Sequence, residues 1–237
     1  MIFRKKKPTH HFPQKSFHER GPHVMVIVIT KDIVEPECMQ SILEQNYTDY
    51  DVMVHVMKSR HQHENPQING VYNMIRNRNY CRQMALASDA QHFLLVDSDV
   101  VLPKNAISSL IQHRKDFIAG WYHVKHYHNK KGWPAAIIQN NTLHYFDEPQ
   151  HSVVMAAMTG LGCALVSRNL LSRVQFNDGT DHIMPTNYGF NVIIDDSSQF
   201  CFDAAAAGFP LYMDGDVICK HLLRYEKPKL VKGKRHA

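Results

Sequence analysis

The sequence has no apolar run long enough to cross a lipid bilayer. Its longest nearly apolar stretch, residues 153–166, is broken by a threonine and two glycines and falls short of the roughly 20 residues that a spanning helix needs. The first 21 residues are basic and lack the apolar centre of a secretory signal. These absences predict a protein without a transmembrane segment, located in the cytoplasm.

The sequence contains cysteines but lacks the closely spaced cysteine pairs that are typical of disulfide or zinc sites. The five cysteines form an odd set without a C-x-x-C pair, at positions 38, 81, 163, 201 and 219. Because disulfide frameworks and zinc knuckles both use paired cysteines, this pattern argues against either and favours a reducing, intracellular compartment. The 17 histidines contain no H-E-x-x-H spacing, so no zinc-protease motif organises them.

The bulk composition is that of one packed globular domain. Hydrophobic residues make up 44% and charged residues 21% of the 237 residues, so a buried core is expected. The net charge of +5 is concentrated at the two ends, with cations at residues 4–7 and again within residues 227–235. We therefore expect a single domain over residues 23–222, with basic flexible tails at residues 1–22 and 223–237.

Apolar, β-branched runs alternate with helical patterns in the first half of the chain. The runs predict strands buried on both faces, as in a parallel sheet, at residues 24–29, 51–57, 93–96 and 117–121. Helical patterns begin between these strands at Pro36, residue 71 and Pro103. Residues 59–69 are polar and predict a loop. The alternation predicts an α/β fold with a mostly parallel, Rossmann-like sheet flanked by helices.

The second half of the chain adds a hairpin before it returns to the core. Residues 123–151 predict this separate subregion, with Asn140-Asn141 as its turn. The core resumes at residues 159–166. A last helix, capped by Asp195 or Asp196, stops at Gly208, and two short strands are expected after it, at residues 211–213 and 217–219.

An acidic triplet, Asp97-Ser98-Asp99, follows one of the buried strands directly. Ligands of open parallel sheets bind outside the carboxyl ends of the strands, which is where this triplet is expected to lie. Two carboxylates on alternate residues can both reach one hard cation, or a cation and a ribose. Aspartate is also common in strand-ending turns, so the triplet alone has little specificity.

The surroundings of the triplet resemble a known family. Arg78-Asn79 followed by residues 93–99 is similar to the central motif of family-2-like GT-A glycosyltransferases, in which an R-N helix leads into a strand and a D-x-D. Residues 195–201, with the downstream residues up to His221, look like the E-D-x-x-F-C…H ending of that family. These strings and the β-α-β opening cover most of residues 24–221.

The resemblance implies a fold, a donor and a metal ion. The fold is GT-A, with the small hairpin on the acceptor side, and the donor is a nucleotide-diphosphate sugar, either a UDP- or a GDP-sugar. The cation is Mn²⁺ or Mg²⁺, and the reaction is an inverting displacement onto a hydroxyl of a glycan or other acceptor. Residues carried over as metal ligands are Asp97, Asp99 and His221. Residues carried over as donor-binding are Thr30, Asp32, Arg78, Asp97 and Ser98.

The resemblance also implies a carboxylate base near the start of the last helix. Spacing from Phe200-Cys201 and matching of the acidic pair differ by one residue, so the family pattern does not decide between Asp195 and Asp196. We favour Asp196 as the base and keep Asp195 as the competitor. Candidates on the acceptor side are glycines that let a sugar approach the backbone and aromatic rings on which it can stack, namely Gly160, Gly162, Trp121, Tyr122 and Trp133.

Three other functions fit parts of the sequence. The basic ends are compatible with a transferase of viral or phage type that glycosylates a modified base in DNA in the host cytoplasm, for which DNA binding would depend steeply on salt. A nucleotidyltransferase also uses paired carboxylates, but no Gly-rich phosphate loop with a following lysine comes after the first strand. A non-catalytic nucleic-acid-binding module would keep its function when Asp97 and Asp99 are replaced.

Overall fold

The computed structural model describes residues 2–4, 21–58, 66–125, 131–179, 182–189 and 191–222. The predicted basic tails fall largely on residues 5–20 and 223–237, which lie outside the described residues, and stay a prediction. Strand β1 (Ile2–Arg4) falls inside the first of these tails and pairs antiparallel with β3 (Tyr50–Val56).

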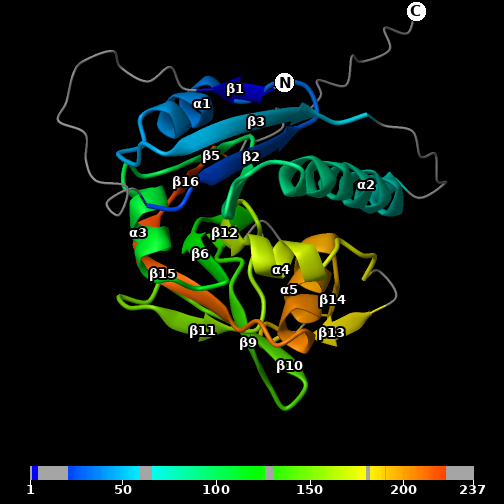
Figure 1. Ribbon diagram of the computed structural model, residues 1–237. Coiled ribbons are helices and arrows are strands. Elements are labelled where there is room, and N and C mark those ends of the chain that lie inside the picture. The colour runs from blue at the N-terminus through cyan, green and yellow to red at the C-terminus, as the bar shows by residue number, and fades with distance from the viewer. Residues whose placement is uncertain are drawn as a thin grey trace, which may run out of the picture.

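A mixed, largely parallel sheet forms the centre of the molecule (Figure 1). Its eight strands follow the order β1-β3-β2-β4-β12-β6-β15-β11. Five of them run in one direction, because β3, β2 and β4 are parallel to one another and β6 and β15 continue that direction beyond β12. The strands not yet given bounds are β2 (Val24–Thr30), β4 (His92–Asp97), β6 (Phe117–Trp121), β11 (Val154–Ala156), β12 (Cys163–Ser167) and β15 (Leu211–Ile218).

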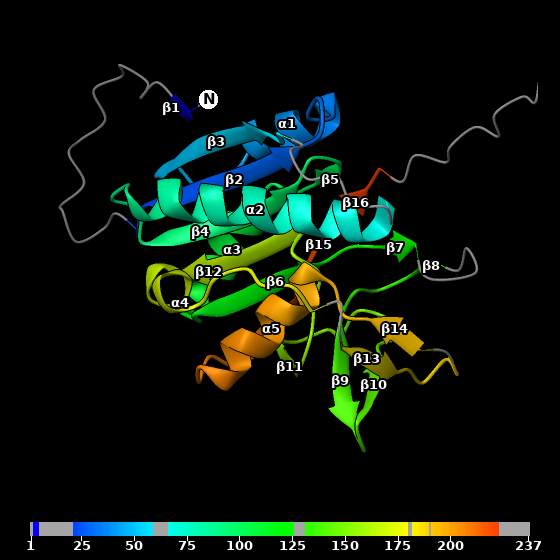
Figure 2. The ribbon, with the colours of Figure 1, turned by 90° about the vertical axis from the view of Figure 1, so that its right-hand side faces the viewer.

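Helices cover both faces of the sheet. Alternate residues of β2 point to opposite faces: Val26 packs with helices α1 (Pro36–Leu43) and α3 (Ala106–Gln112), while Ile27 packs with the helices of the other face. These are α2 (Pro66–Leu86), α4 (Arg168–Arg173) and α5 (Asp196–Ala206). In Figure 2, α2 and α5 lie in front of the sheet. Among the described helices, none is both long and apolar enough to cross a membrane.

The predicted α/β fold with its largely parallel sheet is confirmed, and two local expectations were wrong: the loop at residues 59–69 and the two separate strands at residues 211–213 and 217–219. Helix α2 begins at Pro66 and contains Gly70, although residues 59–69 were expected to form a loop. Strand β12 is antiparallel to both of its neighbours. The last two predicted strands are one continuous strand, β15, which is followed by the short β16 (Lys220–His221) paired with β5 (Val100–Val101).

The predicted hairpin is confirmed and has a second hairpin beside it. Strands β9 (Ala136–Gln139) and β10 (Thr142–Tyr145) are joined by Asn140 and Asn141, whose φ angles of 49° and 58° are those of a tight hairpin turn. The second hairpin, β13 (Ile183–Pro185) with β14 (Asn191–Ile193), contacts the first through a bridge between Leu143 and Thr186. In Figure 1 the first hairpin projects at the bottom of the molecule, and the second lies to the right of the lower end of the sheet.

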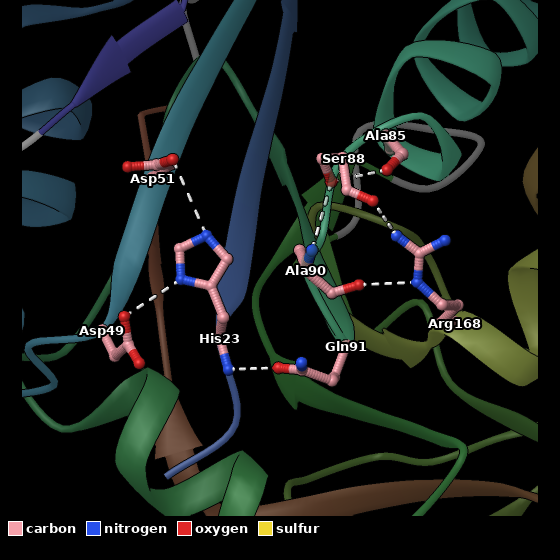
Figure 3. A network of polar contacts seen from close by, with 8 residues as sticks. All are labelled: His23, Asp49, Asp51, Ala85, Ser88, Ala90, Gln91 and Arg168. Carbon is pink, nitrogen blue, oxygen red and sulfur yellow. Dashed lines mark hydrogen bonds and ion pairs between the residues drawn. The ribbon is translucent and has the colours of Figure 1, made fainter. Parts of the chain in front are cut away.

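Two arginines tie α2 and α4 together by capping each other's helix. Arg168 at the start of α4 donates through Nε to the Ala90 carbonyl (2.8 Å) and through Nη2 to the Ser88 carbonyl (Figure 3). It also donates through Nη1 to the Leu86 carbonyl (3.0 Å), so that all three acceptors lie at the end of α2. Arg82 of α2 donates in return to the carbonyls of Leu171, Ser172 and Val174 at the end of α4. Each planar guanidinium therefore satisfies carbonyls that the helix itself leaves free.

We expect Arg168→Met to lower the free energy of unfolding by about 3 kcal/mol, because a charged donor is lost from three carbonyls while the aliphatic stem is kept. Urea unfolding would measure the loss. Arg76→Met, at an exposed position of α2, is the control and should change stability little. Equal effects of the two substitutions would show that the Arg168 contacts contribute nothing specific.

The stability of the fold should also depend on His92, at the start of β4. Burial lowers the pKa of His92, against an opposing effect of Asp116, and its Nδ1 is buried with no hydrogen-bond partner in the described part of the chain. As the pH falls, His92 therefore takes up a proton near pH 6.5 in the unfolded chain but only at a lower pH in the folded protein. The free energy of unfolding consequently decreases as the pH falls from about 6.5 through the folded pKa of His92. We expect His92→Gln to reduce the loss of stability between about pH 8 and about pH 5 in urea unfolding. His151→Gln, at an exposed histidine, should leave the pH dependence as it is.

Candidate active site

The acidic triplet lies at the carboxyl edge of the sheet, beside the end of β2. Ile29 of β2 pairs with Asp97, so the polar residues that follow β2 come next to Asp97-Ser98-Asp99. The turn is fixed by its backbone: the Glu35 amide donates to the Ser98 carbonyl (2.9 Å) and the Leu222 amide to the Asp99 carbonyl (2.8 Å). Segments before α1 and after β16 thus hold the triplet in place.

Two adjoining cavities open at this edge. A cavity of about 730 Å³, here the large cavity, runs from the end of β2 past α2 to the start of α5. A cavity of about 300 Å³, here the small cavity, extends toward Tyr122, Pro134 and Tyr145. The residues that line both are Asp97, Asp195, Ser197 and His221.

The large cavity brings together all the residues that were predicted to bind donor or metal or to act as the base. They are Thr30, Asp32, Arg78, Asp97, Ser98, Asp99, Asp195, Asp196 and His221. Among the described residues that line this cavity there are six carboxylates, since Glu35 joins the five aspartates, against one lysine, Lys31, and one arginine, Arg78. The described lining is therefore strongly anionic, and it suits a ligand that binds together with metal cations.

Arg78 and Asp196 form a buried ion pair inside the large cavity. Arg78 Nε lies 3.1 Å from Asp196 Oδ2, and the two side chains are only 10% and 8% exposed. Burial alone would lower the pKa of Arg78, but Asp196, Asp97 and Asp195 together raise it. Burial raises the pKa of Asp196, and Arg78 opposes that rise. Arg78 Nη1 is buried and has no hydrogen-bond partner among the described residues, so it remains free to bind an anion.

Asp195 has a different position, although it is the neighbour of Asp196. It is the N-cap of α5, where its Oδ1 accepts a hydrogen bond from the Ser198 amide (2.8 Å). Asp195 is exposed and faces both cavities, whereas Asp196 lines only the large one. The structure therefore separates the two candidate bases by their surroundings.

Asp99 and His221 form a second polar pair across the mouth of the site. His221 Nε2 lies 3.2 Å from Asp99 Oδ1, and Nδ1 lies 2.5 Å from the His123 carbonyl oxygen. Because a carbonyl can only accept, Nδ1 carries a hydrogen, and Nε2 is left for Asp99 or for a cation. Burial would lower the pKa of His221, but Asp99, the His123 carbonyl and Asp97 raise it. Within the described residues, no three histidine, cysteine or acidic side chains are grouped closely enough to hold a metal.

Asp97 is packed against the segment that precedes β12. Its amide donates to the Gly162 carbonyl (3.2 Å), and a Cβ atom on Gly162 would come within 2.7 Å of Asp97 Oδ2. Burial raises the pKa of Asp97, an effect that Arg78 opposes and Asp99 reinforces. A cation near this carboxylate would favour its ionised form.

Of the three expected stacking residues, Tyr122 lines the small cavity, whereas Trp121 and Trp133 are core residues. Trp121 is fully buried, with its ring edge-on to Trp133 and Phe146, and Trp133 stacks on His123 at 3.9 Å between ring centroids. Neither tryptophan lines either cavity, and neither does Gly162, whereas Gly160 lines the small cavity. Aromatic residues at strand ends that complete the core are not available to a ligand.

Some residues of the site were not expected from the sequence. Glu35 and Ser197 line the large cavity, and Tyr145 of β10 lines the small one. Ser197 directly follows the predicted acidic pair, which is a usable signal. The sequence gives no such signal for Tyr145, because only the folding of the hairpin brings this residue to the edge of the sheet.

Two solved structures share this architecture. A197 from STIV superposes with a TM-score of 0.57 at 13% identity, over 85% of this chain and 86% of that chain. GalNAc-T7, crystallised with UDP, GalNAc and Mn²⁺, superposes with a TM-score of 0.57 at 9% identity, over 88% of this chain and 45% of that chain. At these identities the likeness shows a shared fold and leaves activity open. No curated protein sequence matches the chain.

The sequence itself decides the family. The model of the family described as "Glycosyltransferase like family 2" matches residues 18–235, which include the whole sheet from β2 to β15 and every residue of both cavities. The chain therefore belongs to the glycosyltransferase-like family 2.

Proposed function

We propose that this protein transfers a sugar from a nucleotide-diphosphate sugar to a hydroxyl group of an acceptor, with inversion at the transferred carbon. The observation that carries the proposal is the large cavity, in which six carboxylates and a buried arginine converge at the carboxyl edge of the sheet. A diphosphate needs cations around it, and this cavity offers Arg78 directly and carboxylates that can hold one more.

The nucleoside end of the donor is assigned to the segment after β2. Thr30 is buried and its hydroxyl donates to the Ile33 carbonyl (2.5 Å), which shapes the turn that presents Asp32 to the cavity. Asp32 is suited to accept hydrogen bonds from a ribose or base, and Ser98 lies between these residues and the triplet. UDP- and GDP-sugars both remain candidates for this site.

Asp97, Asp99 and His221 are the residues that would hold Mn²⁺ or Mg²⁺. Oxygen ligands from one or two carboxylates, completed by phosphate and water, suit Mg²⁺, and an additional imidazole is compatible with Mn²⁺. Because the three side chains are not grouped closely enough to hold an ion by themselves, one or two of them would bind it together with phosphate oxygens and water. Asp97 and His221 line both cavities, and Asp99, which is paired with His221, lines the large one. Such a cation would stabilise the charge that develops on the departing diphosphate.

Asp195 is the better placed base in this proposal. The acceptor hydroxyl attacks the anomeric carbon, the bond from that carbon to the diphosphate breaks, and the hydroxyl proton passes to a carboxylate. An acceptor that enters through the small cavity meets Asp195, which lines both cavities, before it meets Asp196. Asp196 is assigned instead to holding Arg78 in place.

The experiment is a screen of UDP- and GDP-sugars in the presence of Mn²⁺, read by thermal shift and by donor hydrolysis. A donor present at about 100 times its Kd would stabilise the protein by about 2.7 kcal/mol. We expect one donor to raise the Tm, to release nucleoside diphosphate, and to lose both effects when EDTA is added. Release of pyrophosphate would indicate a nucleotidyltransferase. If no donor stabilises the protein and none is hydrolysed, the proposal is wrong.

A further inference from the structure

Tyr122 follows β6 directly, and its hydroxyl is enclosed by the segment that contains Gly160 and Gly162. A Cβ atom on Gly160 would overlap the hydroxyl oxygen of Tyr122, and one on Gly162 would lie 2.8 Å from Tyr122 Cζ and 3.0 Å from the hydroxyl oxygen. The phenol group therefore requires glycine at position 160 and, together with Asp97 Oδ2 at 2.7 Å, at position 162. Close approach of a side chain to backbone is a common reason for glycine at a defined position.

Within the described part of the chain, the hydrogen bonding of Tyr122 leaves its own hydrogen free to be donated. The Gly162 amide donates to the phenolic oxygen (2.9 Å), which thus serves as an acceptor. A phenol has one hydrogen as well as lone pairs, so this contact does not use its donor capacity. The ordinary pKa of a tyrosine phenol, about 10, keeps this hydrogen in place at neutral pH.

The chemistry of the small cavity matches an uncharged, hydroxyl-rich ligand. Tyr122 lines it together with Asp97, Asp195 and His221, and its other walls include apolar Pro134 and Met158. Among the described residues that line this cavity, none is a lysine or an arginine. Carboxylates accept hydrogen bonds from hydroxyl groups and repel phosphates, while the apolar walls suit the C–H faces of a sugar ring.

We infer that the Tyr122 hydroxyl donates a hydrogen bond to a hydroxyl group of the carbohydrate bound where the two cavities meet, which makes Tyr122 a specificity-determining residue. The inference rests on the proposed sugar transfer. The carbohydrate is either the transferred sugar or the acceptor. In the first case a change at Tyr122 should affect donor binding or hydrolysis, and in the second it should affect use of the acceptor. Because Asp97 lines both cavities next to Tyr122, either one would occupy the same junction.

The test replaces Tyr122 by phenylalanine and compares it with Tyr50→Phe. Tyr50 has the same exposure of 3% as Tyr122 and also loses a buried hydrogen bond, to the Ile42 carbonyl (2.7 Å), but it lies outside both cavities. Binding of the nucleoside diphosphate alone and of the sugar nucleotide is measured for each variant, together with donor hydrolysis and transfer.

If the transferred sugar is the partner, Y122F should bind the nucleoside diphosphate as the wild type does, yet lose about 10- to 100-fold in affinity for the sugar nucleotide or in its hydrolysis. If the acceptor is the partner, hydrolysis should persist and the KM for the acceptor should rise by a similar factor. A donor or acceptor analogue that lacks the contacted hydroxyl should be used equally well by both proteins. Y50F should change none of these ratios.

Three results would overturn the inference. The first is an active wild type whose Y122F variant shows unchanged sugar affinity, hydrolysis and acceptor KM, which leaves the proposed function standing. The second is an equal loss of nucleoside diphosphate affinity and sugar nucleotide affinity, which would mean that Tyr122 only positions Asp97. The third is a wild type that neither binds nor hydrolyses any sugar nucleotide, in which case the proposed function falls as well.

Discussion

Replacing Asp195 by asparagine should lower kcat by about 10²- to 10⁴-fold, the range expected when a general base is removed. Asparagine is as good an N-cap as aspartate, so the hydrogen bond from the Ser198 amide and the start of α5 should be preserved. The substitution removes only the charge of the Asp195 side chain, which faces both cavities. The measurement is transfer at saturating donor, with nucleoside diphosphate affinity followed in parallel and expected to stay unchanged.

Asp203→Asn supplies the matched control for this substitution. Asp203 lies on the same helix, where it accepts hydrogen bonds from Asn177 (2.8 Å) and Gln199 (2.7 Å), and it lines neither cavity. Its replacement should leave kcat as it is. If Asp195→Asn keeps full activity while Asp196→Asn, assayed at a temperature where it is still folded, loses it, then Asp196 is the base and the assignment made from the cavities is wrong.

The strands that the sequence predicted best are those buried on both faces. Residues of β2, β4 and β6 form apolar runs, and this local property is enough to place them. The direction of β12 was not predictable in the same way, because a strand buried on both faces has the same composition whether it runs parallel or antiparallel. Its direction is set by the path of the hairpin subregion before it, which is a tertiary property.

The site was predictable where its residues follow strands and not where they come from distant turns. Asp97 and Asp99 could be placed at the sheet edge because the apolar run before them clearly predicts a buried strand. Asp195 and Asp196 could not be told apart, since adjacent residues give one acidic signal in sequence. In the structure, Asp195 turns back to the Ser198 amide as the N-cap, while Asp196 begins the helix and points about 100° away around its axis, to Arg78.

Breaking the Arg78–Asp196 pair should have the largest effect on stability. We expect Arg78→Met and Asp196→Asn each to lower the free energy of unfolding by about 3–5 kcal/mol, because each leaves a buried charge without its partner. The double variant should lose less than the sum of the two, by an amount that a double-mutant cycle in urea measures. Arg76→Met, on the exposed side of α2, is the control for Arg78. Strict additivity would show that the pair is not coupled.

The pH dependence of the Arg78→Met variant tests the same pair by a second route. Burial holds the pKa of Asp196 above its unfolded value, so its contribution to stability is present at low pH and is lost as the pH rises through the folded pKa. Arg78 opposes this rise, and without it the pKa of Asp196 should increase further. The stability gap between wild type and Arg78→Met should therefore be smallest near pH 4 and widen toward neutral pH. In Arg78→Met/Asp196→Asn much of this widening should disappear, because the carboxylate that Arg78 stabilises is no longer there.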